Sequence, residues 1–316
     1  MKILAVLFKT LGDVCMGTTV VHALKQKYPD SKIDFVTMPQ NKHILEGNPD
    51  INEIITLDNY YDANMLAIDG GYDEIYRLNM AEAMDSVWHH LPDQKDQHLV
   101  EWYAKRADIE KLDDKNIYIY LNEEDIESVD DYWEDLDPEQ KYIAVHTTSG
   151  AHPGQAPVVS KDWPNFDALV SMIESQGYKV IQIGAFSDRK IKSDSVIDFT
   201  GKFTFKQTAE VLKRCKAFVG VDSGPAYLAG WAGIPCVLVM GSTQNIGEGK
   251  GPNVGPRNDN VHYINAPKPN NPNCSPVPCY INCQVPEKQA QGGCIFDIKS
   301  QEVASKLFEV IDATKV

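Results

Sequence analysis

Short apolar runs alternate with segments of helical periodicity along this chain, and the alternation occurs twice. In the first half the apolar runs cover residues 3–8, 33–37, 54–57, 74–78 and 118–121. In the second half they cover residues 142–146, 178–183, 217–221 and 236–240. Strands separated by helices of this length pair in parallel through right-handed crossovers. The pattern predicts an α/β protein with two Rossmann-like, doubly wound domains that face each other across a cleft.

An acidic stretch over residues 123–139 lies between the two halves and ends in Leu136-Asp-Pro-Glu-Gln140. We interpret it as a solvated helix followed by the interdomain linker. The predicted domains are therefore residues 1–138 and 139–316. A chain of 316 residues is long enough for both domains to have a core of their own.

The formal net charge of −15 argues against a general nucleic-acid-binding protein, which needs a basic face for phosphates. A local basic pocket for a nucleotide is compatible with this charge. The first apolar run is interrupted by Lys9 and is too short for a signal peptide. No run approaches the roughly 18 apolar residues of a membrane helix. We expect a cytoplasmic protein, and peripheral association with the inner face of the membrane stays open.

The most informative motif follows the apolar run 217–221, where the chain reads Asp222-Ser-Gly-Pro-Ala before further small residues. Gly224 permits a tight turn into a helix, and the start of a helix offers free N–H groups and the positive end of its dipole to a diphosphate. Ser223 adds a hydroxyl donor. The alternative is an ordinary strand–helix junction with Ser223 as the helix cap.

Two further strand ends carry polar residues. His146-Thr-Thr-Ser-Gly150 follows one strand, and Lys161 comes shortly afterwards. Lys161 is a candidate point charge for a phosphate, or a solvated lysine beside a packed Trp163. After the next strand, Ser187 or Asp188 is a candidate contact for a ribose hydroxyl.

Asp13 stands where the first strand is followed by a helix. As a capping acid it would stabilise the helix by about 1 kcal/mol. As a general base it would take the proton of an attacking hydroxyl. Ligands of open α/β sheets bind at the carboxyl ends of the strands, so we expect Asp13 to face the cleft.

Taken in order, these segments resemble the heptosyltransferase-type glycosyltransferase family that builds the inner core of lipopolysaccharide and has the GT-B fold. The resemblance covers nearly the whole chain. It is carried by residues 11–14, 25–29, 142–148, 161–164, 198–201 and 220–225.

The resemblance implies inverting transfer of a sugar from a nucleotide diphosphate sugar, by default ADP-heptose, to a hydroxyl of a glycan, a lipid-linked glycan or a protein. It implies that Asp13 is the base and that Lys161 stabilises the departing nucleotide without a catalytic metal. The first domain would bind the acceptor and the second the donor. The implied substrate contacts are Gly12, Thr147, Thr148, Asp222, Ser223, Gly224 and Tyr227.

Tyr227 departs from the family pattern, which has histidine at this position. Tyrosine can donate a hydrogen bond or stack, but it carries no imidazolium charge at neutral pH. The donor is therefore open, and a nucleotide-sugar epimerase or a non-catalytic sugar-binding protein of the same fold are the alternative functions. A dinucleotide oxidoreductase is disfavoured because Gly12 and Gly17 do not form a Gly-x-Gly-x-x-Gly turn.

Residues 80–107 are predicted to form a largely helical region that shapes the acceptor site. Trp88, His89, His90 and Trp102 would stack on sugars there, or form a packed aromatic helix.

The seven cysteines fall into two groups. Cys15, Cys215 and Cys236 are isolated in apolar surroundings, which predicts small buried side chains. The other four are spaced C-x4-C-x3-C-x10-C in a loop rich in proline and glycine, and they are Cys274, Cys279, Cys283 and Cys294. Such thiolates can hold a structural zinc or iron, and the resemblance implies iron in one protein-modifying branch. The spacing matches no standard metal motif, and free thiols or disulfides, which are rare in the cytoplasm, are the alternatives.

Overall fold

The computed structural model describes residues 1–78, 98–114, 116–149, 161–243, 254–267, 287 and 293–314. The chain divides into two compact units, Met1–Asn122 (unit 1) and Glu123–Val316 (unit 2). This division places the helix α6 (Glu123–Trp133) in unit 2. The predicted boundary after residue 138 had assigned the same residues to the first domain.

Unit 1 contains a four-stranded parallel sheet of β1 (Lys2–Val6), β2 (Lys32–Thr37), β3 (Glu53–Thr56) and β4 (Glu74–Arg77). The strand order is β3-β2-β1-β4. Its described helical segments are α1 (Leu11–Lys27), η1 (Pro39–Asn41), α2 (Lys42–Leu45), α3 (Tyr60–Asp69) and α5 (Leu99–Arg106).

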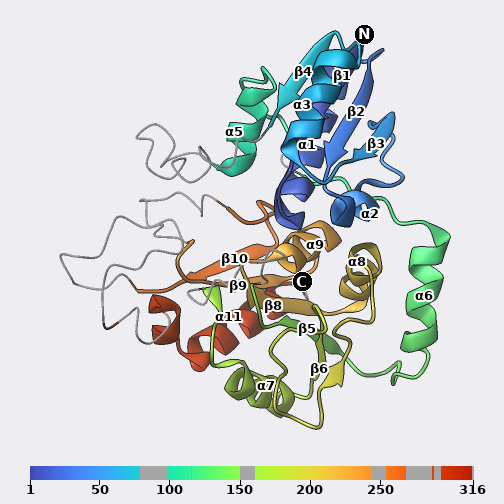
Figure 1. Ribbon diagram of the computed structural model, residues 1–316. Helices are drawn as coiled ribbons and strands as arrows, with labels where there is room; N and C mark the ends of the chain where they lie inside the picture. The colour runs from blue at the N-terminus through green and yellow to red at the C-terminus, as the bar shows by residue number, and fades with distance from the viewer. Residues whose placement is uncertain are drawn as a thin grey trace. The chain divides into compact units, whose positions relative to one another are not determined.

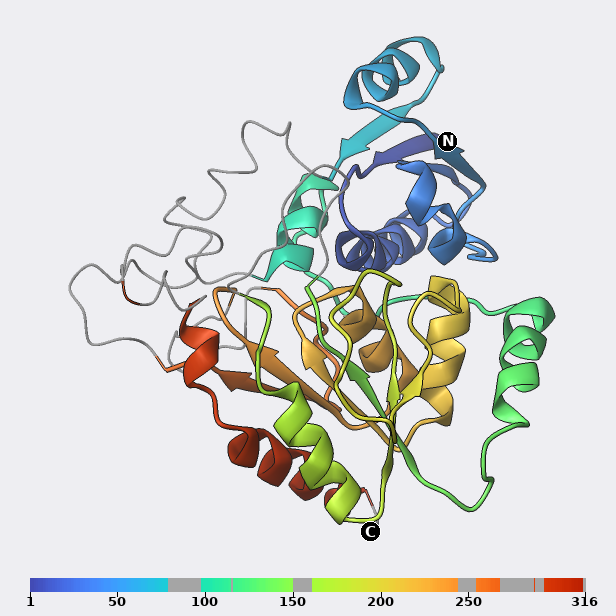
Figure 2. The same cartoon turned by 60° about the horizontal axis from the view of Figure 1, so that its bottom comes forward.

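The sheet of unit 1 is covered by α1 on one face and by α3 on the other (Figure 2). Leu4 and Val6 of β1 pack against Ala63 and Ala67 of α3, because alternate residues of a strand point to the same face. On the α1 side, a Cβ atom at Gly17 would come within 2.8 Å of Leu7 Cδ2. Glycine at this position therefore lets α1 lie close to the strands.

The strand predicted over residues 118–121 is wrong. Residues 116–122 form no strand and run along α1, where Thr18 Oγ1 accepts a hydrogen bond from Tyr118 N at 2.9 Å. Thr19 Oγ1 donates to Asn116 O at 2.7 Å. Hydroxyl groups of α1 thus bond to the backbone of this segment, as a neighbouring strand would do in a sheet.

Unit 2 contains a six-stranded parallel sheet in the order β10-β9-β8-β5-β6-β7 (Figure 1). The strands are β5 (Tyr142–His146), β6 (Lys179–Gln182), β7 (Ile197–Asp198), β8 (Ala217–Val221), β9 (Cys236–Met240) and β10 (Val261–Asn265). The strands β5 and β8 are neighbours in the sheet but are not consecutive in the chain. The strand order therefore reverses between them, at the topological switch point of a doubly wound sheet.

The helices of unit 2 form two layers. In Figure 2, α7 (Phe166–Ser175) and α11 (Ser300–Ala313) cover one face of the sheet, and α8 (Phe205–Arg214) and α9 (Gly224–Ala232) cover the other. The buried apolar residues of the strands, α7 and α11 form one continuous core. The two parallel, helix-covered sheets confirm the predicted α/β class with two Rossmann-like halves.

The helix α6 is mostly exposed, as its acidic composition predicted, and one side of it contacts α8. Lys206 Nζ, which is buried on α8, lies 3.0 Å from Asp125 Oδ2, and Arg214 Nη2 lies 2.7 Å from Asp130 Oδ1. Val129 of α6 is fully buried. Acidic side chains of α6 therefore attach it to basic side chains of α8, which explains why α6 groups with unit 2.

The isolated cysteines Cys15, Cys215 and Cys236 are buried, as expected. Burial raises the pKa of Cys215 to about 12 and raises the pKa of Cys15 and of Cys236 further, so these thiols stay protonated at neutral pH. Within the described ranges, no helix is both long and apolar enough to cross a membrane.

Candidate active site

Asp13 lies in the first turn of α1, which begins at Leu11, so its carboxylate follows closely on the end of β1. It is not the N-cap of the helix, since Thr10 holds that position. The hydroxyl of Thr10 donates to Asp13 Oδ2 and makes no capping bond to the helix backbone. Gly12 is buried beside it in the same turn.

A second hydroxyl reaches Asp13 from α5. Tyr103 Oη donates to Asp13 Oδ1 at 2.6 Å, and Tyr103 is only 1% exposed. Tyr103 was not among the predicted site residues, because nothing in the local pattern of α5 shows which residue meets α1. Trp102 of the same helix is buried, and the guanidinium of Arg106 lies 5.1 Å from its ring centroid. Trp102 therefore belongs to the packed aromatic helix, whereas Trp88, His89 and His90 lie outside the described residues.

In unit 2, Lys161 forms an ion pair with Asp222, the residue directly after β8. Lys161 Nζ donates to Asp222 Oδ2 at 2.7 Å, and the side chains are 22% and 8% exposed. An ammonium group has three N–H donors, and Asp222 accepts one of them. Lys161 is therefore a partly buried cation held in place by Asp222, and not a solvated surface lysine.

Ser223 belongs to a buried row of hydrogen bonds that joins three strand ends. Ser223 Oγ lies 2.9 Å from His146 Nδ1, and His146 Nε2 lies 3.1 Å from Asp188 Oδ2. Ser223 is the N-cap residue of α9 by position, but its hydroxyl makes no capping bond and contacts Val221 O instead. Gly224 is the first residue of α9. We call Ser223, His146 and Asp188 the buried relay.

The buried relay changes the expectation for Asp188. Its carboxylate points inward to His146 and accepts a hydrogen bond from Ala185 N at 2.7 Å, whereas Ser187 beside it is exposed. Gly184 has φ = +133°, and a Cβ atom there would collide with the Asp188 carboxylate. The role of His146 had no signal in the sequence beyond its position at the end of a strand.

Thr147 and Thr148 contact the loop after β6. Thr147 Oγ1 donates to Arg189 O at 2.6 Å, and Thr148 Oγ1 accepts from Arg189 N at 3.1 Å. Thr147 is buried and Thr148 is half-buried. Both hydroxyls therefore fix this loop in the unit as described.

Tyr227 is buried on α9, where its hydroxyl accepts a hydrogen bond from Gly255 N at 2.8 Å. Tyr263 Oη donates to the neighbouring Pro256 O. Burial, together with nearby Cys236 and Asp222, raises the pKa of Tyr263 well above its ordinary value, so this donor stays protonated. The two tyrosines attach the segment 254–256 to α9 and β10.

The predicted metal site lies mostly outside the described residues, which include Cys294 but not Cys274, Cys279 or Cys283. Cys294 begins the short helix η5 (Cys294–Asp297) and packs against the core of unit 2. Among the residues that the structure describes, no group of three or more His, Cys, Asp or Glu side chains is arranged to hold a metal ion.

Known proteins resemble the chain in sequence and in fold. The lipopolysaccharide heptosyltransferase 3 of Escherichia coli K12 is 22% identical over 283 residues, which is 74% of this chain and 81% of the relative. The glycosyl transferase family 9 protein of Veillonella parvula has a TM-score of 0.76 at 19% identity, with 99% and 97% of the two chains covered.

A third similar protein is the iron-containing dodecameric heptosyltransferase TibC of enterotoxigenic E. coli, whose structure was solved with ADP-D-β-D-heptose. Its TM-score is 0.68 at 14% identity, and the match covers 99% of this chain and 76% of TibC. These identities are low, so the structural likeness establishes the GT-B fold and not a substrate.

The family follows from the sequence itself. The family model for glycosyltransferase family 9 (heptosyltransferase) matches residues 70–280. This range includes Lys161, the buried relay and Tyr227. The chain is a glycosyltransferase that belongs to glycosyltransferase family 9, the heptosyltransferase family.

Proposed function

We propose that this protein transfers a heptose, with inversion at the anomeric carbon, from an ADP-heptose-like donor to a hydroxyl of a glycan acceptor. Unit 1 binds the acceptor and supplies the base, and unit 2 binds the donor. The observation that supports this division most strongly is Asp13, a carboxylate after β1 that is oriented by the neutral hydroxyls of Thr10 and Tyr103.

Asp13 performs the proton transfer. The acceptor hydroxyl gives its proton to a carboxylate oxygen of Asp13 as the acceptor oxygen bonds to the anomeric carbon of the donor. The bond between that carbon and the diphosphate oxygen breaks, and the electron pair leaves with the nucleoside diphosphate. The hydroxyls of Thr10 and Tyr103 hold the carboxylate in one orientation for this step.

Unit 2 stabilises the leaving group. Lys161 Nζ has donors beyond the one that Asp222 accepts, and the first turn of α9 carries the positive end of a helix dipole. Fixed positive groups directed at the developing phosphate charge lower the barrier to departure. In this proposal Gly224 allows close approach of the phosphate, Ser223 and Asp222 order the turn, and Gly12, Thr147, Thr148 and Tyr227 shape the surrounding substrate site.

The substrate assignment rests on the relatives. One relative is named as a lipopolysaccharide heptosyltransferase, and TibC was solved with ADP-D-β-D-heptose. We propose ADP-heptose as the donor for this chain. We propose a growing lipopolysaccharide core, a lipid-linked glycan or a protein as the acceptor class. With these acceptors, the proposed reaction takes place in the cytoplasm or at the inner face of the membrane. The proposal includes no nucleic-acid partner.

A nucleotide-release assay tests the proposal. Purified protein is incubated with ADP-heptose, UDP-glucose or GDP-mannose, each with and without a lipopolysaccharide core acceptor. The expected result is acceptor-dependent ADP release, and a product whose anomeric configuration by NMR is opposite to that of the donor. Retention of configuration, or conversion of the donor without any acceptor product, would contradict the proposal.

We also propose that the four C-terminal cysteines hold a structural zinc or iron that takes no part in the transfer. TibC is named as iron-containing. Metal analysis of the purified protein and of Cys279→Ser tests this. About one bound metal ion per chain that is lost in the variant is the expected result, and a metal-free wild-type protein would contradict it.

A further inference from the structure

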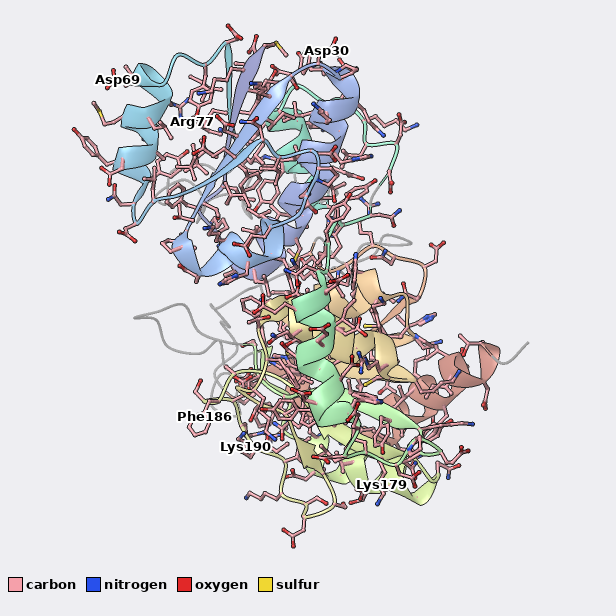
Figure 3. The ribbon with its side chains drawn as sticks, turned by 90° about the vertical axis from the view of Figure 1, so that its right-hand side faces the viewer. Asp30, Asp69, Arg77, Lys179, Phe186 and Lys190 are labelled. Atoms are coloured by element: carbon pink, nitrogen blue, oxygen red, sulfur yellow. The ribbon has the colours of Figure 1, made fainter. Side chains whose placement is uncertain are left out.

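Phe186 is an exposed aromatic side chain at the edge of the sheet where the proposed donor binds. It is 82% exposed, more than any other exposed large apolar side chain of the described residues. It follows β6, so it belongs to the same carboxyl edge as Ser223 after β8 and His146 at the end of β5. In Figure 3, Phe186 and Lys190 lie on one side of unit 2, and Lys179, the first residue of β6, lies toward the other.

The backbone beneath Phe186 is held rigidly. Asp188 N donates to Ala185 O at 3.0 Å, which makes Phe186 and Ser187 the two central residues of a tight turn. The Asp188 carboxylate closes the turn by accepting from Ala185 N. On the other side, Gly201 N donates to Gly184 O at 2.8 Å.

Close packing adds to this constraint. Gly201 has φ = +71°, and a Cβ atom there would come within 2.8 Å of Phe186 Cβ. A phenylalanine on a mobile loop would not have its backbone held by hydrogen bonds and close packing in this way. The ring of Phe186 is therefore presented to solvent by a turn that is fixed on both sides.

The turn of Phe186 is also connected to the proposed diphosphate site. Asp188, which closes the turn, bonds to His146, and His146 bonds to Ser223 at the start of α9. The buried relay thus links the Phe186 turn to the start of α9 through buried, directional contacts. The strands β8, β5 and β6 are adjacent, and neighbouring strands lie about 4.8 Å apart. Two such spacings put the start of α9 and the end of β6 about 10 Å apart, which is on the scale of a nucleoside diphosphate.

An ion pair lies beside the ring. Lys190 Nζ lies 5.6 Å from the ring centroid of Phe186 and bonds to Asp198 at 2.8 Å. Burial raises the pKa of the Asp198 carboxyl, and hydrogen bonds from Lys190 and Thr200 lower it to below its usual value. An exposed aromatic ring suits the π-face of a nucleobase.

We propose that Phe186 is a stacking platform for the base of the donor nucleotide and that it makes the site prefer purine over pyrimidine nucleoside diphosphates. This inference rests on the proposed function, because it needs the diphosphate to bind at the start of α9. Stacking uses the face of the base, and a purine has the larger face. Aromatic stacking on one base changes affinity by about tenfold or more.

The test is calorimetric titration of the full-length protein with ADP, UDP and inorganic pyrophosphate. ADP is expected to bind more tightly than UDP. In Phe186→Ala the ADP affinity falls by about tenfold and the UDP affinity falls less, so that the two converge, whereas pyrophosphate, which has no base, binds as before. Phe186→Trp keeps the preference, and its indole fluorescence is quenched by ADP.

The matched control is Phe308→Ala, which removes a partly buried aromatic residue of α11 that stacks on Tyr178 at 6.2 Å. It should leave all three affinities unchanged. If Phe186→Ala binds ADP like the wild type while Lys161→Gln weakens ADP, the base lies elsewhere and the inference fails although the donor site stands. If neither ADP nor pyrophosphate binds the wild type, the donor site itself fails.

Discussion

The two units have the same kind of fold, but their carboxylates have different kinds of hydrogen-bond partner. In unit 1, Asp13 is bonded by the neutral hydroxyls of Thr10 and Tyr103. In unit 2, Asp222 pairs with the ammonium of Lys161, and Asp188 pairs with the ring of His146. The hydroxyls of Thr10 and Tyr103 orient the Asp13 carboxylate, whereas the Asp222 carboxylate holds the Lys161 ammonium in place. Under the proposed function, unit 1 provides the base and unit 2 binds the donor.

The two sites also differ in how they are built. Unit 2 joins the ends of β5, β6 and β8 through the buried relay. In unit 1, residues from α1 and α5 meet at one carboxylate. In the proposed function the base belongs to unit 1 and the groups that face the donor phosphates belong to unit 2. Substitutions in unit 1 should therefore affect turnover most, and substitutions in unit 2 should affect donor affinity.

The largest effect is expected for Asp13→Asn. Removal of the general base should lower kcat by about a thousandfold and leave the donor KM unchanged, as measured by nucleotide release at saturating acceptor. Asp30→Asn, at an exposed aspartate of the same unit, is the matched control and should retain full activity. Wild-type turnover in Asp13→Asn would show that another group is the base.

The next largest effect is expected for Lys161→Gln. The amide can still donate to Asp222, but the positive charge near the phosphates is lost. The donor KM should rise by about tenfold and kcat should fall, since charged hydrogen bonds to phosphate are roughly twice as strong as neutral ones. Lys179→Gln, at an exposed lysine at the start of β6, should change neither value. An unchanged donor KM in Lys161→Gln would remove Lys161 from the donor site.

A smaller effect is expected for Tyr103→Phe. The variant keeps the buried ring but loses the hydroxyl that orients Asp13, so kcat should fall by about tenfold with the donor KM unchanged. A raised donor KM would mean that Tyr103 acts through the donor and not through Asp13. Steady-state kinetics with the same acceptor separates the two outcomes.

The smallest effect on transfer is expected for Tyr227→Phe. Gly255 N would lose its buried acceptor, which should lower the free energy of unfolding by about 1–3 kcal/mol, as measured by urea denaturation. The donor affinity should stay close to that of the wild type, because the hydroxyl is engaged with the backbone. A clear loss of donor affinity without loss of stability would instead make Tyr227 a direct donor contact.

Periodicity and turn chemistry were sufficient to predict most of the strands and the two-unit α/β architecture. They failed for residues 118–121, whose apolar alternation packs against α1 instead of a neighbouring strand. The short strands β7 and β10 were also missed. Local propensity cannot distinguish these cases, because the partner of an extended segment is decided by tertiary packing.

For the candidate site, the strand ends were predictable because parallel strands bring their carboxyl ends to one edge. The hydrogen-bond partners of the site residues were not predictable. Tyr103 reaches Asp13 across 90 residues of sequence, and Ser223 reaches His146 across 77. Such pairs leave no local spacing in the sequence, so only the folded structure identifies them.

The division of roles between the units is tested most directly by calorimetric titration of ADP into Asp13→Asn and into Lys161→Gln, each compared with the wild type. We expect Asp13→Asn to bind ADP as the wild type does and Lys161→Gln to bind it about tenfold more weakly. An equal loss of ADP affinity in both variants, or a loss only in Asp13→Asn, would contradict the assignment of reactivity to unit 1 and donor binding to unit 2.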